Sequence, residues 1–329
     1  MIVDVESSGI LRTTLFFQNM KSLRTALLIV SALLLARPSF SQETTAQQYK
    51  DRYATLVKNL GTAGVGIETL LDRWMNDYPD DPDPMEYKFI YYLAKSQTTQ
   101  IVPRDGKTYL GNEPVLSLTD SLGNPVNYFQ DIIYDDEIFG QAIKTLEDAI
   151  AKYPNRLDWR FFKATALSEY EKESPDMASA ELKSIIDYNY TQHPKWTYPD
   201  SEVDNEFFAA GIQEYCVSFF RTATPASREA FREISLKMLD YEPNNVLFLD
   251  NVGSYFVTMN DHKTAYKYYN KVLKLQKDDL TAIRNCILMA RRDKDVKNEK
   301  KYLQMMVAYG ETEADRTSAQ MRLDSYNKK

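Results

Sequence analysis

Acidic side chains gather at two places where they could hold a cation or perform acid–base chemistry. Asp80, Asp81 and Asp83 form the first run, and residues 135–137 (Asp-Asp-Glu) form the second. The first run lacks the central glycine and the terminal glutamate of an EF-hand calcium loop. The second could supply the paired carboxylates of a glycoside hydrolase, but adjacency in sequence does not fix a separation in space. Both runs are typical of acids that cap the start of a helix, which is the interpretation favoured here.

Few other residues could carry catalysis or bind a metal. Neither His193 nor His262 has a triad partner at a recognisable spacing, and both are expected at the surface or in a linker. The sequence contains no phosphate-binding glycine loop, nucleophile elbow or His-Glu-x-x-His motif. The chain holds only two Cys and two His, and no Cys/His metal centre is expected. The sequence therefore predicts no enzyme, cofactor or metal site.

Aromatic residues concentrate in residues 188–198, which read Tyr-Asn-Tyr-Thr-Gln-His-Pro-Lys-Trp-Thr-Tyr. The rings of Tyr188, Tyr190, Trp196 and Tyr198 fall in this segment, which we expect to be a loop because a proline interrupts it. Exposed rings could stack on a sugar or a peptide. Large rings are more often buried, so the favoured interpretation is that they fill a groove between helix pairs. A glycan-binding envelope protein that uses this loop is the alternative function.

Beyond residue 43, hydrophobic residues recur with the period of helices. Ile143, Leu146 and Ile150 give one example of this spacing. Prolines at 79, 154 and 243 are expected to separate one helix from the next, because proline cannot continue a helix. Cys216 and Cys286 lie inside such apolar patterns and are predicted to be buried free thiols.

Residues 246–279 have the spacing of a helix–turn–helix unit. Small residues, Gly253 and Ala265, fall where its two helices would approach closely, and the proline of the preceding unit is kept at Pro243. The positions of this unit that carry large apolar residues are Leu249, Val252, Phe256, Tyr269 and Val272. Residues 142–154 and 159–167 repeat parts of the pattern. Over most of residues 44–309 the chain resembles the tetratricopeptide-repeat family, whose units are about 34 residues long.

The resemblance implies an all-α fold, a right-handed superhelix of helix–turn–helix repeats over residues 42–329. It also implies an adaptor or scaffold that binds a protein or peptide on its concave face, without catalysis. First-helix positions that face inward in the family fall on Phe161, Thr165, Asp250, Ser254, Arg284 and Leu288. The Lys/Asn set with which some members clamp a peptide C-terminal carboxylate is absent, because Asp250 and Ser254 occupy two of its places. The alternative is a non-repetitive α bundle.

Two segments depart from the repeat. Residues 98–130 are predicted to be an inserted β-hairpin, because residues 115–119 and 126–129 alternate in polarity around a Gly-Asn-Pro turn. Insertions in repeat arrays project as loops, often on the binding face. Residues 280–309 have Glu299 where the family has alanine, as expected of an atypical terminal repeat.

Residues 1–41 are predicted to be a signal-peptide region, with Met20 as an alternative start. Lys21 and Arg24 precede a short apolar run, and a cut is expected after Ser41. The run is shorter than the roughly 20 residues that a bilayer crossing needs, although an uncleaved anchor is the alternative. No cysteine stands near the cut, so a lipid anchor is not expected. We therefore expect a periplasmic or secreted protein without an integral membrane span.

The charge of the chain restricts its partners. Its 47 acidic residues outnumber 40 basic ones, which gives a net charge of -7. Nucleic-acid-binding proteins usually carry a basic surface, so no nucleic acid is expected as a partner. A protein or peptide is the predicted partner, with a glycan as the alternative.

Overall fold

The computed structural model describes residues 43–199 and 201–327, so the predicted signal-peptide region lies outside the described residues. The described chain forms thirteen helices and three strands, which agrees with the predicted mainly helical class. Its contacts divide it into two compact units. The N-terminal unit holds residues 43–209 and 218–230, and the C-terminal unit holds residues 210–217 and 231–327.

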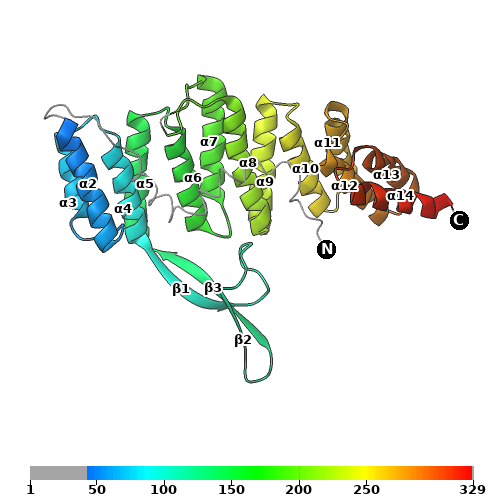
Figure 1. The fold of residues 1–329 in the computed structure, drawn as a ribbon, viewed down its shortest axis with the longest axis horizontal. Coiled ribbons are helices and arrows are strands. Elements are labelled where there is room, and N and C mark those ends of the chain that lie inside the picture. The colour runs from blue at the N-terminus through cyan, green and yellow to red at the C-terminus, as the bar shows by residue number, and fades with distance from the viewer. Residues whose placement is uncertain (1–42, 200, 328–329) are drawn as a thin grey trace. The chain divides into compact units, whose positions relative to one another are not determined.

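Each unit is built from helices that lie side by side (Figure 1). The N-terminal unit contains α2 (Glu43–Leu60), α3 (Ile67–Asp77), α4 (Asp83–Ser96), α5 (Asp136–Lys152), α6 (Leu157–Glu171) and α7 (Asp176–Gln192). Parts of α8 (Asn205–Thr222) and α9 (Pro225–Tyr241) belong to each unit. The C-terminal unit contains α10 (Val246–Thr258), α11 (His262–Leu275), α12 (Leu280–Arg292), α13 (Val296–Tyr309) and α14 (Glu313–Asn327). Consecutive helices pack in pairs, among them α6 with α7, α10 with α11 and α12 with α13.

Acidic and amide side chains fix where many of these helices begin. A side-chain oxygen accepts a hydrogen bond from a backbone N–H two or three residues later at Asp135, Asp204, Asn245, Asp261, Asp279 and Asp295. The predicted capping role of residues 135–137 is thus confirmed. In the other acidic run, Asp81 accepts hydrogen bonds from the Trp74 ring N–H and the Asp83 backbone N–H. That run links α3 to α4.

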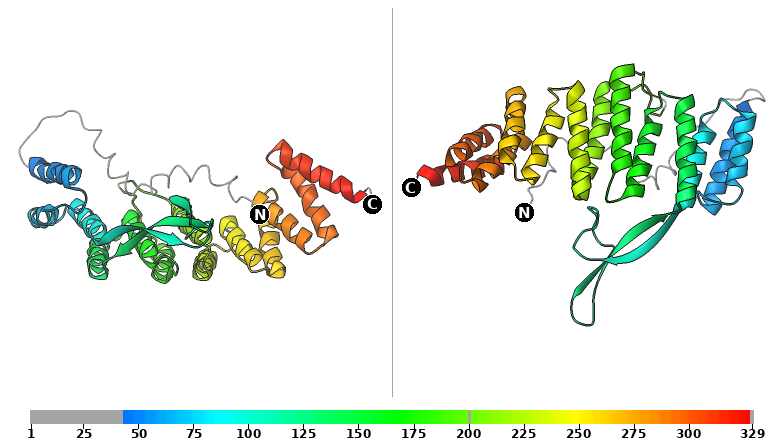
Figure 2. Two further views of the ribbon diagram at one scale, coloured as in Figure 1. Left: turned by 90° about the horizontal axis from the view of Figure 1, so that it is seen from below. Right: turned by 180° about the vertical axis from the view of Figure 1, so that it is seen from behind.

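The insertion is a three-stranded antiparallel sheet with the order β1–β3–β2. The predicted hairpin is confirmed as β2 (Leu116–Thr119) and β3 (Pro125–Tyr134), with Leu118 opposite Val126. The prediction missed β1 (Gln97–Arg104), so the insertion covers residues 97–134 and joins α4 to α5. Figures 1 and 2 show the sheet projecting from the ends of these two helices.

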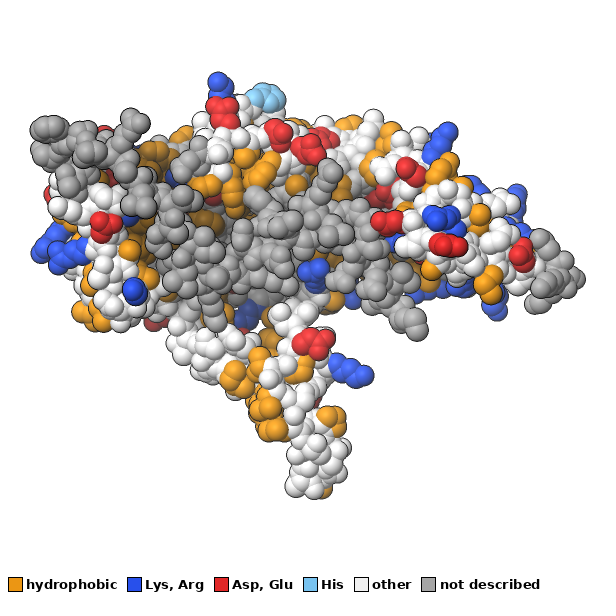
Figure 3. Space-filling view, viewed as in Figure 1, with side chains coloured by type: hydrophobic (Ala, Val, Ile, Leu, Met, Phe, Trp, Pro, Cys, Tyr) orange, Lys and Arg blue, Asp and Glu red, His pale blue; other side chains and the backbone are white. Residues whose placement is uncertain are grey.

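One face of this sheet is apolar and open. The strand register places Ile101, Leu116 and Leu118 on the same face, and each side chain is about half exposed, at 55%, 48% and 49%. Figure 3 shows hydrophobic side chains over the sheet. On the opposite face Phe129 is buried, and the ring of Tyr109 lies 5.8 Å from it. Tyr134, at the end of β3 on the same face as Ile101, contacts the rings of Phe139 and Tyr170, so this face is open only along the part of the sheet that holds Ile101, Leu116 and Leu118.

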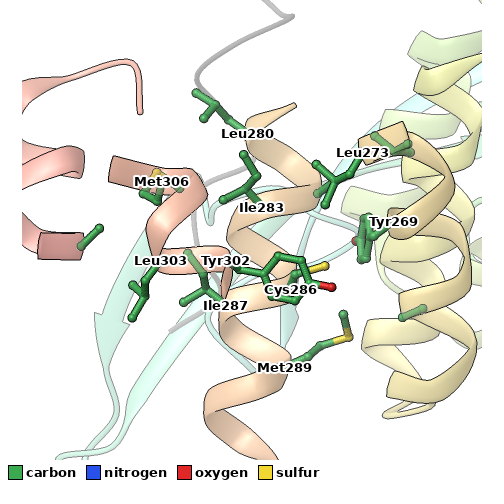
Figure 4. Close-up of a cluster of buried hydrophobic side chains, with 14 of the residues drawn as sticks. Tyr269, Leu273, Leu280, Ile283, Cys286, Ile287, Met289, Tyr302, Leu303 and Met306 are labelled. Carbon is green, nitrogen blue, oxygen red and sulfur yellow. The ribbon is translucent and has the colours of Figure 1, made fainter. Parts of the chain in front are cut away.

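The hydrophobic core of each unit lies between its helices. In the N-terminal unit Trp74, Phe89 and Trp159 are almost fully buried. Figure 4 shows the corresponding cluster of the C-terminal unit, which includes Tyr269, Ile283, Cys286 and Tyr302. No described helix combines the length and apolar character that a membrane crossing would need.

Both cysteines are free and buried, as predicted. Burial raises the pKa of the Cys216 thiol and of the Cys286 thiol to about 12. Because the thiolate is the reactive form, both side chains act as small hydrophobic core residues.

Candidate binding groove in the C-terminal unit

The C-terminal unit has a surface groove of about 630 Å³ between α12, α13 and α14. Its lining combines aliphatic side chains with three arginines, Arg284, Arg291 and Arg322. The aliphatic lining residues are Ile287, Leu288, Leu303, Met306, Ala314 and Ala319. Two of the six residues predicted from the repeat resemblance, Arg284 and Leu288, lie in this groove.

The amphipathic pattern of α12 places its side chains on two faces. Arg284, Ile287, Leu288 and Arg291 follow the i, i+3, i+4, i+7 spacing of one helix face, and all four line the groove. On the other side, residues such as Cys286 enter the core. In Figure 4, Ile287 of α12 and Leu303 of α13 lie within the same buried cluster, which forms the floor of the groove.

Glu299, on α13, is the buried charge of this region. Its side chain is only 3% exposed. Its Oε1 accepts hydrogen bonds from Arg291 Nε at 3.1 Å and Arg322 Nε at 3.0 Å, while its Oε2 accepts one from the Tyr326 hydroxyl. Burial raises the pKa of Glu299, but these three donors outweigh it and leave that pKa below its usual value. Glu299 is therefore ionised at neutral pH and holds two guanidinium groups.

A second ion pair joins the start of α14 to α12. Arg284 Nη2 lies 3.4 Å from Asp315 Oδ2, and the same carboxylate oxygen accepts a hydrogen bond from the Thr312 hydroxyl at 2.9 Å. Burial raises the pKa of Asp315, but Thr312 and Arg284 outweigh it and lower the pKa overall. At this wall of the groove one arginine, Arg284, is paired with one carboxylate, Asp315. At Glu299, by contrast, two arginines share a single carboxylate.

The other predicted partner-binding residues do not form one open surface with Arg284 and Leu288. Phe161 is 2% exposed and its ring stacks on Phe208, so the prediction that it faces a partner is wrong. Thr165, on the same helix of the N-terminal unit, is half-buried. Ser254 is half-buried in the C-terminal unit, and its hydroxyl lies 3.0 Å from that of Tyr269.

Asp250 is an internal acid rather than a surface residue, which corrects its predicted partner-binding position. It is 8% exposed, and its Oδ1 has no hydrogen-bond partner among the described residues. Burial and the neighbouring carboxyl of Asp279 raise the pKa of Asp250 well above its usual value. The interaction of Asp250 with Asp279 links α10 to the N-cap of α12.

The predicted aromatic loop is half helix. Helix α7 continues to Gln192, so Tyr188 and Tyr190 are helical, and only the residues after it form a loop. Trp196 is 2% exposed, its ring is stacked on Phe208, and its ring N–H donates a 2.8 Å hydrogen bond to Asn189 Oδ1. This agrees with the favoured interpretation of buried rings. A sugar-stacking platform would need the face of Trp196 to be open.

The remaining rings of that segment also have protein neighbours. The guanidinium of Arg160 lies 4.3 Å from the ring centroid of Tyr188 and 5.4 Å from that of Trp196. The ring of Tyr190 contacts Phe208, and the ring of Tyr198 contacts Phe207. The cluster fills space between helices of the N-terminal unit.

The two histidines have different surroundings. His193 is exposed and ends α7 with a left-handed backbone, as expected of a linker position. The surface position predicted for His262 is wrong. It is 8% exposed, and its Nδ1 lies 2.7 Å from Asp293 Oδ1 because α11 begins beside the end of α12. Within the described residues, no three His, Cys, Asp or Glu side chains are placed to hold a metal ion.

Sequence reasoning missed Arg291 and Arg322 as groove residues, and Glu299 as the carboxylate that holds them. The one available signal was Glu299 itself, an acid at a position where the repeat pattern expects alanine.

Comparison with known proteins gives no match: neither a family model nor a curated protein resembles the chain significantly. What the groove binds must therefore be inferred from its own residues.

Proposed function

We propose that this chain is an exported, non-catalytic adaptor or scaffold of the tetratricopeptide-repeat type, which binds a segment of a partner protein in the C-terminal groove. The groove itself carries this proposal. Three consecutive helices line it with aliphatic and arginine side chains, and two of its residues, Arg284 and Leu288, are inward-facing positions in the family pattern.

The composition of the groove suits a peptide segment. Arginine and methionine are enriched at protein interfaces, and arginine is among the residues that most often carry a large share of the binding energy. A volume of about 630 Å³ falls within the range of roughly 300–1,000 Å³ typical of ligand pockets. It can hold a few side chains of a partner, and a folded domain would contact only its rim.

The contact between α10 and α11 supports a repeat register. A Cβ atom added at Gly253 would lie 2.8 Å from the Tyr269 ring, and Ala265 is completely buried. The helices are therefore as close as the pattern of small residues requires. Helix α14 packs on α13 after the last pair, as a terminal capping helix does in repeat arrays. We extend the proposal to a right-handed superhelical arrangement of the repeats.

Affinity capture tests the binding role. The full chain and two variants, Leu288→Asp and Leu275→Asp, would be immobilised and exposed to envelope extract, and captured proteins identified by mass spectrometry. Leu288 lies in the groove, whereas Leu275 is an exposed leucine outside its lining. We expect Leu288→Asp to lose the specific partner and Leu275→Asp to keep it. Equal capture by the two variants would refute a partner site in this groove.

Intact-mass measurement tests the export part of the proposal. Expression in a bacterium with two membranes, followed by fractionation, should give a soluble envelope protein that begins at or near Gln42. An uncut chain in the membrane pellet would contradict export by a cleaved signal peptide.

A further inference from the structure

We infer that the groove selects partner segments in which Asp or Glu side chains stand next to aliphatic ones, and that Arg291 and Arg322 bind those carboxylates. The inference rests on the proposed function and specifies the chemistry of its partner.

The first support is that Glu299 holds each of the two arginines through its Nε atom, which leaves the terminal nitrogens at the far end of the guanidinium. Arg291 and Arg322 each donate from Nε to Oε1 of Glu299. The Arg291 side chain makes no other hydrogen bond or ion pair with the described residues, and it is 53% exposed. Both of its terminal nitrogens therefore remain for a ligand. A guanidinium offers such a pair of N–H groups to a carboxylate in a bidentate arrangement.

Arg322 adds a second donor at the same place. Its Nη2 donates to the Tyr326 hydroxyl at 2.8 Å, and its side chain is 43% exposed. The Tyr326 ring lies beneath this guanidinium, 4.9 Å from ring centroid to Cζ, and helps to fix its plane. One ligand carboxylate beside these arginines would give two positive and two negative groups.

The preference for acidic partners is local. The chain has a net charge of -7, so its overall field does not attract anions. At the other wall, Arg284 is balanced by Asp315. Excess positive charge in the groove therefore lies at Arg291 and Arg322. Leu288, between Arg284 and Arg291 on α12, and Met306 of α13 supply the adjacent apolar surface.

Peptides fixed through their C termini test the inference without a free terminal carboxylate. The array would pair nonapeptides of Leu, Val, Asp and Glu with counterparts in which Asn and Gln replace the acids. We expect the full chain to bind the best acidic peptides at least about tenfold more tightly than their neutral counterparts, measured by fluorescence anisotropy on C-terminally amidated peptides in solution.

Substitutions on α12 locate the effect. Arg291→Gln should reduce the acidic preference to less than about threefold, and Arg291→Lys should retain part of it, because lysine keeps the charge but not the bidentate geometry. Arg292→Gln is the matched control, since Arg292 is an exposed neighbour outside the groove lining. Circular dichroism would show that each variant is folded. Should Arg291→Gln fail to fold, Arg322→Gln gives the same test.

The possible results separate the inference from the proposed function. Tight binding of aliphatic peptides without acidic preference would overturn the inference and leave the binding role intact. An acidic preference that is unchanged in both Arg291→Gln and Arg322→Gln would also overturn the inference and leave the binding role intact. A neutral peptide with a free C-terminal carboxylate that binds as tightly as the acidic peptides would show recognition of chain ends instead. Binding of no peptide at all would contradict both proposals.

Discussion

Trp196 shows how a ring that looks like a ligand platform can belong to the core. It contacts Phe208 and Arg160 and donates its ring N–H to Asn189. We expect Trp196→Ala to lower the free energy of unfolding by about 3–5 kcal/mol, because it leaves a large cavity. Urea denaturation would measure the loss. Lys195→Ala, at an exposed position, should change stability by less than about 0.5 kcal/mol. If Trp196→Ala were as stable as the parent chain, the ring would not support the core, and the glycan-binding alternative would stand again.

Asp250 should give the C-terminal unit an unusual pH dependence. Its pKa in the folded state lies above the value of about 3.9 for an unfolded chain, so folding binds a proton. The stability contributed by Asp250 is then complete below pH 4 and is lost as the pH rises through the folded-state pKa. The groups that face it include Asp279, Tyr269 and Cys286, and the pKa values of all three are raised.

Asp250→Asn tests this assignment, because asparagine has the shape of the protonated acid but cannot ionise. We expect the urea midpoint of the parent chain to fall relative to that of the variant as the pH rises above about 4, the unfolded value. Parallel curves for the two proteins would mean that Asp250 has the same protonation state when folded and unfolded.

For single residues, the sequence predicted the place along a helix better than it predicted which other side chains lie around that residue. Arg284 and Leu288 were found because one helical period relates them to the repeat. Glu299 binds arginines that lie 8 and 23 residues away on two other helices, and no sequence period marks such a pair. Phe161 was placed wrongly because exposure depends on neighbouring helices, and here Phe208 covers it.

Helices α10 and α11 of the C-terminal unit approach each other closely, because a Cβ atom added at Gly253 would lie 2.8 Å from the Tyr269 ring. Ala265 is fully buried there, so Ala265→Leu adds volume that the contact cannot accept, at a cost of about 1–3 kcal/mol. Thr258→Leu, at an exposed position on α10, should cost much less. Thermal denaturation would compare the two variants. Equal melting temperatures would contradict the close contact and the repeat register built on it.

Helices were predictable because capping residues and prolines mark their ends. The two elements that were predicted wrongly, β1 and the end of α7, each have a local cause. Strand β1 was missed because its first residues, Gln-Thr-Thr-Gln, are largely exposed and show no polar alternation. Its place depends on pairing with β3, which the sequence alone does not reveal. Helix α7 runs further than predicted because Pro194 disfavours helical backbone only at the residue before it, His193.

Each compact unit contains an acid with a lowered pKa, and this determines how the whole molecule should respond to low pH. In the N-terminal unit Asp131, on β3, accepts hydrogen bonds from Arg104 at 3.1 Å and Lys172 at 2.6 Å. Burial raises the pKa of Asp131, but Lys172 and Arg104 outweigh it. In the C-terminal unit the acid of this kind is Glu299, whose pKa is lowered by Tyr326 and two arginines.

A depressed pKa contributes stability that is present above the unfolded value of about 4 and is lost as the pH falls through the folded-state pKa. We therefore expect both units to lose stability between about pH 5 and pH 2. Hydrogen exchange of peptides from residues 97–134 and 296–327 would follow the units separately. In Asp131→Asn, which cannot ionise, the acid-induced loss of protection should shrink in the first segment and stay unchanged in the second. If protection in residues 97–134 falls as steeply with pH in Asp131→Asn as in the parent chain, Asp131 does not hold the sheet against α6 through its charge.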